Sequence, residues 1–414
     1  MVLERIVSSL MKTGDLTVTD WNGHVRHYGD GSLPKSHIKI ESAAAARRMA
    51  IDPDLYLGEC YMDGSFKILK GTISDFLDFA MKNAGTTNYH PVHRALIRAR
   101  MAMRHIHQHN PIGKARQNVA HHYDLSGAIY DLFLDPDRQY SCAYFETKNA
   151  TLEEAQLAKK RHLAAKLDIK PGMKVLDIGS GWGGLGLYLA EVCGAVVTGV
   201  TLSEEQFNLS NERAQQRGLK VNAKFLLKDY RELEGPFDRI VSVGMFEHVG
   251  IGHFPEFFSK VATLLNDDGA AVLHSINRSN GPGATSAWIK KYIFPGGYVP
   301  ALSEVLPHLE TAGLYVTDVE ILRLHYANTL KEWGHRFAAN RVKAQEIYDE
   351  RFCRMWEFYL AASEMAFRYC GMNNFQIQFG KNQNVLPLTR DYILEQENRL
   401  RKIEAKTPLL KMVR

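Results

Sequence analysis

The chain has 414 residues, of which 45% are hydrophobic and 23% are charged, so its composition is that of an ordinary globular protein. This length favours two or three domains and is sufficient for a large core. The formal net charge of only +5 excludes a generally basic nucleic-acid-binding protein, and no nucleic-acid partner is expected.

The five cysteines are scattered and include no Cys-x-x-Cys pair, which argues against a disulfide framework or a zinc site and favours a reducing cytoplasm. The N-terminal residues include Glu4 and lack a long apolar run, so they do not have the pattern of a secretory signal. No stretch approaches the roughly 18 apolar residues of a membrane-spanning helix. Any membrane contact is therefore expected to be peripheral.

The first 90 residues have the pattern of a small α+β unit. A helix is expected from Leu3, and residues 16–19 and 25–28 alternate like the strands of a hairpin around Asn22-Gly23. A third strand at 38–40 and helices at 43–49 and 73–81 are expected to follow. No catalytic cluster stands out, so we interpret this part as a binding or docking domain.

Residues 79–123 contain no Asp or Glu but carry several basic side chains: Lys82, Arg94, Arg98, Arg100, Arg104, Lys114 and Arg116. One interpretation is a solvated basic linker. The other is a surface for anionic lipid headgroups, to which each nearby basic side chain contributes about 1 kcal/mol. His105, His107 and His109 alternate without a Cys or carboxylate partner, so no metal site is predicted.

From residue 118 onward, apolar strands alternate with helices. Strands are expected at 175–178, 196–200, 223–227, 238–243, 270–275 and 315–321, and helices at 151–167, 204–217, 254–265 and 301–312. Such alternation is typical of a doubly wound, mostly parallel α/β sheet. A charged helix at 392–403, with no chemistry of its own, is expected to end the chain.

The stretch 174–206 is the part around which the rest is organised. Its first strand is interrupted by Asp177 and ends in a turn rich in glycine, which allows the backbone to approach a ligand closely. In a β-α-β unit of this kind, a nucleotide-like ligand lies at the carboxyl ends of the strands. The turn lacks the full Gly-x-Gly-x-x-Gly phosphate fingerprint. It resembles instead motif I of S-adenosylmethionine-dependent methyltransferases.

Nine short sequences, in order, resemble the cyclopropane-fatty-acyl-phospholipid synthases, a family related to the mycolic acid cyclopropane synthases. They occupy residues 121–126, 140–145, 176–184, 201–206, 228–242, 245–250, 288–300, 325–333 and 367–378, and the likeness covers nearly the whole chain. Two positions depart from the family. Ser180 stands where many members have Cys, and Ser363 stands where studied members have a cysteine, with Cys370 beyond it. We interpret that thiol as dispensable.

The resemblance implies a Rossmann-like class I methyltransferase fold, a doubly wound α/β sheet with a small α+β N-terminal domain. On this basis residues 1–90 form a lipid-associated docking domain and residues 91–117 a basic linker. Residues 118–385 form the methyltransferase catalytic domain, and residues 386–414 a C-terminal helical tail.

The activity implied is transfer of a methylene unit from S-adenosylmethionine to the cis double bond of an unsaturated phospholipid acyl chain, which forms a cyclopropane fatty acid. An alkene is a weak nucleophile, so the site must align it with the sulfonium methyl group and stabilise a carbocation. Ring closure needs a base for a proton of the transferred methyl group. In this family a bicarbonate ion is held to be that base.

By matched motif, the catalytic residues around bicarbonate would be Cys142, Glu247, His274, Ile276 and Tyr326. Cys142 and Ile276 would donate backbone N–H groups, which suit an anion. His274 and Tyr326 would donate from their side chains, and Glu247 would orient the proton-bearing oxygen. Without the resemblance, Glu247 is the strongest candidate, because it follows a strand at its carboxyl end. Taken alone, Cys142 is more often a small buried hydrophobic residue and Tyr326 is more often part of a core.

The resemblance also assigns cofactor contacts. The glycines would let the backbone meet the methionine moiety, and the residues after the second and third strands would meet the ribose and the adenine. The residues concerned are Tyr140, Ser141, Gly179, Gly181, Gly183, Thr201, Leu202, Gln206, Asp229 and Tyr230. Aromatic-rich segments at 288–298, 352–359 and 367–379 are candidates for lining an acyl tunnel.

Three alternatives remain. The same scaffold could produce methyl-branched instead of cyclopropane acyl chains. A silent lipid-binding protein is disfavoured because Glu247, His274 and Tyr326 are all present, and a small-molecule methyltransferase is disfavoured by the N-terminal domain. The expected partner is unsaturated phospholipid, met by a cytoplasmic protein at the inner face of the cell membrane, and a homodimer is compatible with this assignment. Acyl length, double-bond position and headgroup preference cannot be read from the residues.

Overall fold

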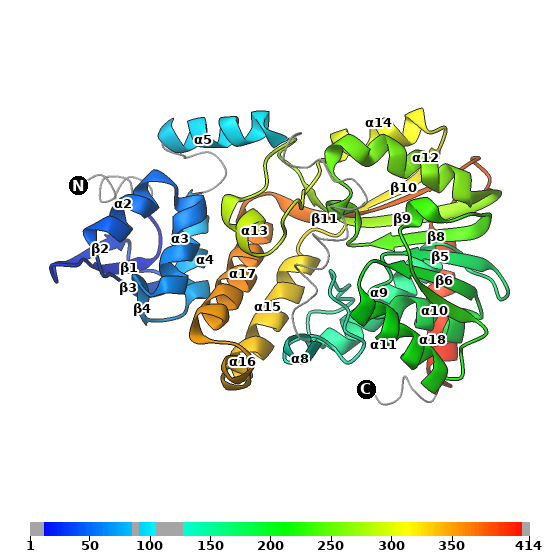
Figure 1. Ribbon diagram of the computed structural model, residues 1–414, viewed down its shortest axis with the longest axis horizontal. Coiled ribbons are helices and arrows are strands. Elements are labelled where there is room, and N and C mark those ends of the chain that lie inside the picture. The colour runs from blue at the N-terminus through cyan, green and yellow to red at the C-terminus, as the bar shows by residue number, and fades with distance from the viewer. Residues whose placement is uncertain (1–11, 85–90, 105–126, 408–414) are drawn as a thin grey trace. The chain divides into compact units, whose positions relative to one another are not determined.

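The computed structural model describes residues 12–84, 91–104 and 127–407 (Figure 1). The helix expected from Leu3, the alternating histidines and the motif at 121–126 lie outside these residues. The chain forms two compact units that join segments distant in the sequence. The first combines the N-terminal part with residues 283–295 and 327–372, and the second contains the remainder. The division of the chain into four consecutive segments, with boundaries at residues 90, 117 and 385, stays a prediction.

The N-terminal part contains a four-stranded sheet of order β2-β1-β3-β4. Its strands are β1 (Asp15–Thr19), β2 (Val25–Gly29), β3 (Lys35–Ile40) and β4 (Phe66–Lys70). The predicted hairpin is confirmed, since β1 pairs with β2 in antiparallel register. Asp20 stabilises its turn by accepting from the backbone N–H groups of Asn22 and His24, each at 2.9 Å.

Helices complete the first unit. They are α2 (Ala43–Ile51), α3 (Pro53–Asp63), α4 (Ile73–Ala84), α5 (Pro91–Ala102), α13 (Ala287–Tyr292), α16 (Arg341–Ile347) and α17 (Glu350–Tyr369), together with most of α15 (His325–Ala339). Trp288 is fully buried, with its ring 4.8 Å from that of Phe358 in an edge-on arrangement. These aromatic side chains build the core of the unit, and the acyl tunnel stays a prediction.

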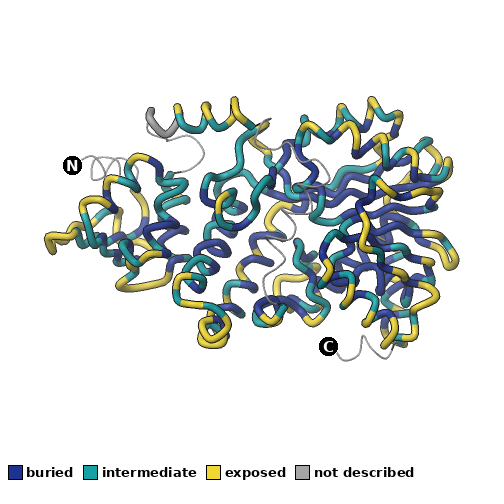
Figure 2. Tube along the Cα trace, in the orientation of Figure 1, coloured by how far each residue is buried: buried dark blue, intermediate teal, exposed yellow. Residues whose placement is uncertain are grey.

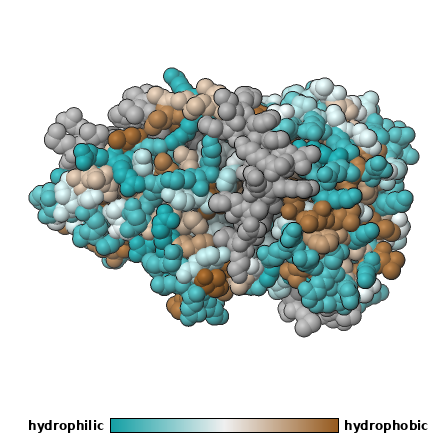
Figure 3. All heavy atoms as spheres, viewed as in Figure 1, coloured by the Kyte–Doolittle hydropathy of each residue, from teal (hydrophilic) through white to brown (hydrophobic). Residues whose placement is uncertain are grey.

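The basic segment is not simply a row of solvated cations. Arg100 on α5 donates to Asp54 at 2.7 Å and to Asp52 at 2.5 Å, and Asp52 is buried. The carboxylates absent from the local sequence are therefore supplied by the start of α3, whereas Arg98 is exposed. Exposed apolar side chains of the same unit include Trp21 and Leu33. Figure 3 shows hydrophobic residues scattered among hydrophilic ones on one face of the protein.

The second unit is built on a seven-stranded sheet of order β10-β11-β9-β8-β5-β6-β7. Its strands are β5 (Lys174–Ile178), β6 (Val196–Thr201), β7 (Ala223–Leu227), β8 (Phe237–Val243), β9 (Leu265–Arg278), β10 (Tyr315–Ile321) and β11 (Met372–Gly380). From β7 to β9 all neighbours are parallel, and β10 and β11 are antiparallel. The predicted doubly wound, mostly parallel sheet is confirmed.

Helices cover both faces of this sheet (Figure 1). One face packs on α9 (Leu152–Lys166), α10 (Gly184–Cys193) and α18 (Asp391–Glu404), and the other on α12 (Phe254–Leu264) and α14 (Leu302–Thr311). The central strands are buried between these layers, as the dark traces in Figure 2 show. Their near-continuous apolar runs are the pattern expected of strands covered on both faces.

Helix α9 begins with the predicted N-cap, Thr151, which forms a capping box with Glu154. Helix α18 confirms the predicted C-terminal helix, but it is an integral part of the layer. Glu404 on α18 is buried, where it accepts from Arg161 of α9 at 2.8 Å and from Tyr188 of α10 at 2.7 Å. The end of the described chain thus stabilises the helices that support the site.

Strand β11 is an addition to the strands predicted from the sequence, since residues 367–379 are predicted only as a family motif and an aromatic-rich stretch. Its inward residues Asn374, Gln376 and Gln378 are buried and polar, and they face α9 and His274. The Gln378 amide donates to the carbonyl oxygen of Lys166 at 2.7 Å, and the Gln376 amide lies 3.2 Å from His274 Nδ1. Among the described residues, no helix is long and apolar enough to cross a membrane.

Candidate active site

In the glycine turn after β5, two glycines are tightly packed and one faces open space. Gly179, Gly181 and Gly183 have positive φ values of 80°, 54° and 84°. A Cβ on Gly179 would lie 2.7 Å from Met245 Cβ, and one on Gly183 would lie 2.8 Å from Ser210 Cβ. A Cβ on Gly181 would meet nothing within 4 Å. The turn therefore presents open space beside Gly181, which fits a ligand that approaches the backbone.

Two buried oxygen atoms beside this turn lack a hydrogen-bond partner among the described residues: Asp177 Oδ2 and Ser180 Oγ. Burial raises the pKa of Asp177 to about 7, and the charge of Lys159 offsets part of this effect. Acceptors without a donor at the carboxyl end of β5 fit a ligand that carries N–H or O–H groups. Asp177 was not predicted as a site residue, although its position before the glycines was the available signal.

After β6, Thr201 and Gln206 are bonded to each other. The Thr201 hydroxyl donates to Gln206 Oε1 at 2.7 Å, and both residues are buried. Ser203 caps helix α11 (Glu204–Gln216), and Leu202 is half-buried. The oxygen of the Gln206 amide is thus engaged, which leaves its amide nitrogen as the end suited to a ribose hydroxyl.

After β7, Asp229 caps a short 3-10 helix, η1 (Tyr230–Glu232). Its carboxylate receives the Arg231 side chain through both oxygens, at 2.9 and 2.7 Å. Ionised carboxylates have about four acceptor sites, so Asp229 can still accept from an adenine amine. The Tyr230 ring packs edge-on against Phe257 at 5.5 Å and belongs to the core. Sequence reasoning missed Arg231, because no pattern marks it as the partner of Asp229.

The segment that carries Tyr140, Ser141 and Cys142 is held in an unusual conformation. Arg138 has φ = 52°, uncommon for a residue with a side chain, and its guanidinium makes two 2.7 Å bonds to Asp131. The Tyr140 ring lies 5.4 Å from that of Tyr130. Such a backbone conformation persists only where its surroundings enforce it, and it is frequent at ligand sites.

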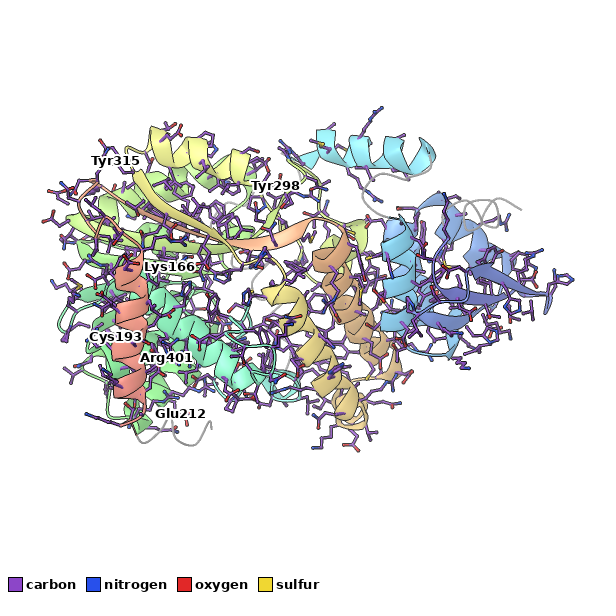
Figure 4. All side chains as sticks on the ribbon, turned by 180° about the vertical axis from the view of Figure 1, so that it is seen from behind. Lys166, Cys193, Glu212, Tyr298, Tyr315 and Arg401 are labelled. Atoms are coloured by element: carbon purple, nitrogen blue, oxygen red, sulfur yellow. The ribbon has the colours of Figure 1, made fainter. Side chains whose placement is uncertain are left out.

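Glu247 lies in a 3-10 turn, η2 (Phe246–His248), after β8. Its Oε1 accepts the backbone N–H of Ile276 at 2.6 Å, and its buried Oε2 has no partner among the described residues. Burial raises the pKa of Glu247 to about 7 against the opposing effect of the Ile276 bond. The carbonyl oxygen of Glu247 accepts from the N–H of Tyr298, which Figure 4 labels. This carboxyl group can therefore lose or hold a proton near neutral pH.

His274 lies on β9 next to the β8 strand that leads to Glu247, and the N–H of Gly244 donates to its carbonyl oxygen at 2.9 Å. Its ring nitrogens face the amides of Asn374 at 3.4 Å and Gln376 at 3.2 Å. Burial lowers the pKa of His274 to about 3, so the imidazole is neutral at physiological pH. A neutral imidazole offers one donor and one acceptor, so only one of these two amide nitrogens can donate to the ring.

Cys142 and Tyr326 come from segments that a hydrogen bond connects. The Phe145 N–H donates to Nδ1 of His325 at 2.9 Å, and the Tyr144 ring stacks on the His325 ring at 4.8 Å. Cys142 and Tyr326 are both buried. The structure thus joins the predicted catalytic residues in two groups: Glu247 with His274 and Ile276, and the segment of Cys142 with that of Tyr326.

The two groups meet at the loop after β8. A Cβ on Gly244 would lie 3.8 Å from Ser141 Cβ, so the Ser141–Cys142 segment passes beside the loop that leads to Glu247. The glycine turn, the ends of β6 and β7, and Glu247 all lie at the carboxyl edge of the parallel strands. Ligands bind at this edge in open α/β sheets.

Comparisons with known proteins agree with this geometry. The family model described as mycolic acid cyclopropane synthetase matches residues 111–377, and a domain of unknown function matches residues 2–90. The cyclopropane-fatty-acyl-phospholipid synthase of Escherichia coli K12 is 36% identical over 87% of this chain and 92% of its own. A Pseudomonas putida protein described as a probable fatty acid methyltransferase is 40% identical over 66% of this chain and 72% of its own.

A solved structure of the mycolic acid cyclopropane synthase CmaA1, complexed with SAH and CTAB, is 35% identical, with a TM-score of 0.61 over 64% of this chain and 97% of its own. Together with the sheet and its glycine turn, these similarities define a class I S-adenosylmethionine-dependent methyltransferase. More specifically, the chain belongs to the mycolic acid cyclopropane synthetase family.

Proposed function

We propose that this protein transfers a methylene unit from S-adenosylmethionine to the cis double bond of unsaturated phospholipid acyl chains and so forms cyclopropane fatty acids. One observation carries the proposal. Glu247, a buried carboxyl group with a pKa of about 7 and a partner-free oxygen, lies beside His274 and Ile276 at the ligand edge of the sheet. An alkene substrate requires such a proton acceptor, because the transferred methyl group must lose a proton before the ring can close.

The order of bond changes follows from the chemistry of an alkene. S-adenosylmethionine supplies an electrophilic methyl group. The alkene electron pair forms the new carbon–carbon bond, which leaves a carbocation on the acyl chain. Loss of a proton from the transferred methyl group then provides the electron pair that closes the ring. The protein must align the alkene, exclude water from the cation and receive the proton.

For the proton acceptor, we propose a bicarbonate ion held by Cys142, Glu247, His274, Ile276 and Tyr326. The neutral imidazole of His274 could donate to an anion only from the ring nitrogen that does not accept from an amide. Glu247 near pH 7 can carry a proton and donate it, so its carboxyl group need not repel the anion. The Ile276 N–H already donates to Glu247 Oε1, so an anion would have to share this donor. The same arrangement also suits Glu247 as the base itself.

The second candidate product is a methyl-branched acyl chain. The Pseudomonas putida relative, 40% identical, favours it, since that protein is described as a probable fatty acid methyltransferase. If the carbocation lost a proton from the acyl chain instead of the methyl group, the product would be a methyl-branched unsaturated chain. The same residues would bind the cofactor in both cases. The position of the proton acceptor relative to the new methyl group decides between the products.

We also propose that the protein works in the cytoplasm, in peripheral contact with the inner face of the cell membrane. A phospholipid substrate requires such contact, and the exposed Arg98 on α5 suits an anionic lipid surface.

Purified protein incubated with S-adenosylmethionine and vesicles of cis-monounsaturated phospholipid tests this proposal. We expect acyl chains that are one carbon heavier and no longer react as alkenes, as judged by mass spectrometry after release. A matched incubation with the free fatty acid should give little product. Modification of only the free acid would overturn the phospholipid assignment, and modification of neither would overturn the function.

A further inference from the structure

Helix α9 buries two lysines completely, and they have different surroundings. The ammonium group of Lys166 lies 2.5 Å from Glu320 Oε2 of β10. Lys159, two turns earlier, forms no ion pair with any carboxylate of the described residues, although it is equally buried. A buried ammonium group is costly unless its hydrogen bonds are satisfied. The hydrogen-bond partners of the Lys159 ammonium group therefore indicate its role.

Lys159 Nζ donates to Gln139 Oε1 and to Ser141 Oγ, each at 2.8 Å. One turn earlier on α9, the amide of Gln156 donates to the carbonyl oxygens of the same two residues, at 3.1 and 3.0 Å. Helix α9 thus binds the residues on both sides of Tyr140, through side chain and backbone. Two of these bonds end on Ser141, in the segment predicted to close over the cofactor, and two end on Gln139, directly before that segment.

The two residues held by Lys159 reach different parts of the site. The Gln139 side chain packs against Gly184, the first residue of α10, where an added Cβ would collide with its amide nitrogen. Ser141 lies beside Gly244 in the loop that leads to Glu247. Lys159 therefore connects α9 with both the end of the glycine turn and the loop after β8.

The charged and titratable groups that act on Lys159 surround it from several elements. They are Asp135, Asp137 and Cys142 from the preceding loop, Lys160 from α9, Asp177 from β5 and His274 from β9. Burial lowers the pKa of Lys159 to about 7, and Asp135 opposes this shift. Burial raises the pKa of Asp177, and the charge of Lys159 counteracts that rise. The ammonium group thus also favours the ionised form of the acid beside the glycine turn.

We propose that Lys159 is a positioning residue for cofactor binding, which holds Gln139 and Ser141 so that the Tyr140–Ser141 segment closes over the methionine moiety of S-adenosylmethionine. The inference rests on the proposed function only in taking this segment as a cofactor contact. Lys159 itself is fully buried and acts through the residues it holds.

The test compares Lys159→Met with Lys166→Met, which removes an equally buried ammonium group from the same helix. Figure 4 labels Lys166 at the end of α9, where its carbonyl oxygen accepts from Tyr392 of α18 at 2.9 Å. Calorimetry with S-adenosylhomocysteine measures cofactor affinity, and thermal unfolding measures stability separately. We expect Lys159→Met to raise Kd about tenfold, because buried acceptors lose their donor. Lys166→Met should lower Tm and leave Kd within about twofold.

Gln139→Leu removes one acceptor of Lys159 without altering a predicted cofactor contact, and it keeps the inference testable if Lys159→Met fails to fold. Gln139→Leu should also raise the Kd for S-adenosylhomocysteine. The Kd of the Lys159→Met/Gln139→Leu double variant should be no higher than that of Lys159→Met, since both changes break the same connection. Unchanged Kd in either single variant, or strictly additive effects, would overturn the positioning role. Absence of S-adenosylhomocysteine binding by the unaltered protein would instead overturn the proposed function.

Discussion

Among single residues, Glu247 is distinguished by a buried carboxyl group whose pKa is raised to about 7. Its carboxyl group is buried, one oxygen accepts from Ile276 and the other has no partner among the described residues. A folded pKa near 7 means that the folded state binds more protons than the unfolded state between about pH 4.5 and 7. The contribution of Glu247 to the free energy of unfolding therefore falls as pH rises through this window.

Glu247→Gln keeps an oxygen for the Ile276 N–H and removes the ionisation. We expect activity to fall by about a hundredfold or more, as is typical for a misplaced group at a transition state. The free energy of unfolding of the variant, relative to the unaltered protein, should rise between pH 5 and pH 8. Denaturant unfolding at both pH values, with activity assays, measures this. Equal stability differences at the two pH values would contradict a buried carboxyl group with a raised pKa.

Depletion of dissolved carbon dioxide separates the two candidate bases. If bicarbonate accepts the proton, the unaltered enzyme should slow on depletion and recover when bicarbonate is added back. If Glu247 is the base, depletion should leave the rate unchanged while Glu247→Gln stays inactive. Initial rates in degassed and bicarbonate-supplemented buffers of equal pH give the answer.

The glycine turn allows a matched comparison. Gly181 and Gly172 both have positive φ, 54° and 82°, and an added Cβ meets nothing within 4 Å at either position. Alanine at each should therefore cost a similar 1–2 kcal/mol or so of backbone strain. Only Gly181→Ala should also weaken S-adenosylhomocysteine binding, by about tenfold or more, because only that methyl group would point at the cofactor. Equal Kd values for the two variants would show that the open space beside Gly181 is not the cofactor site.

At the scale of elements, the sequence predicted six of the seven strands of the large sheet and missed β11. Five of the six contain apolar runs, and β10 ends in an alternation of apolar and charged residues, so all six have a pattern that periodicity detects. In β11 the apolar residues Phe375, Ile377 and Phe379 alternate with Asn374, Gln376 and Gln378, which is the pattern of a strand with one solvated face. The pattern does not reveal that the polar face is buried as well. Charged residues of α9 mislead in the same way, since Lys159 and Lys166 are buried although lysines usually mark a solvent face.

The site was predictable to a similar degree. Motif resemblance indicated Glu247, His274 and the glycines, and the structure places them at one edge of the sheet. It could not reveal Lys159, because its contacts with Gln139 and Ser141 depend on the fold. Arg231 is a close neighbour of Asp229 in the sequence, but no motif marks the pair. The roles of the predicted residues in binding and catalysis stay predictions until they are tested.

A buried histidine, His162, connects helix α18 to helix α9 and strand β10. His162 of α9 contacts Glu397 of α18 at 2.7 Å and Glu320 of β10 at 2.8 Å. Burial alone would lower its pKa, but the bonds to both carboxylates outweigh burial and raise the pKa. The stability it contributes is complete below about pH 6.5, and it is lost as pH rises through the raised folded pKa.

His162→Gln should lower the free energy of unfolding by about 3 kcal/mol and remove this pH-dependent component. His253→Gln is the control, because His253 also lies 3.0 Å from a carboxylate, Glu256, which is exposed. That change should cost no more than about 0.5 kcal/mol. Denaturant unfolding at pH 6 and pH 9 measures both variants. A similar loss in both would show that His162 does not clamp α18.

At the scale of the whole molecule, membrane docking can be tested on α5. Arg98 is exposed, whereas Arg100 is engaged by Asp52 and Asp54. If α5 docks on anionic lipid, Arg98→Gln should weaken vesicle binding by about fivefold, equivalent to about 1 kcal/mol, and binding should fall with salt. Arg100→Gln should chiefly lower stability. Vesicle sedimentation that is independent of salt and equal for Arg98→Gln and the unaltered protein would leave α5 as a solvated helix.

The central claim is that a methylene unit from S-adenosylmethionine becomes the ring carbon of a cyclopropane in a phospholipid acyl chain. Incubation of the full chain with S-adenosylmethionine carrying a trideuterated methyl group, and with cis-monounsaturated phospholipid vesicles, tests it most directly. Mass spectrometry should show one added carbon that retains two of the three deuterium atoms, and proton NMR of unlabelled product should show cyclopropane signals. Retention of all three deuterium atoms, or an added carbon outside a ring, would contradict ring formation and establish the methyl-branched product instead.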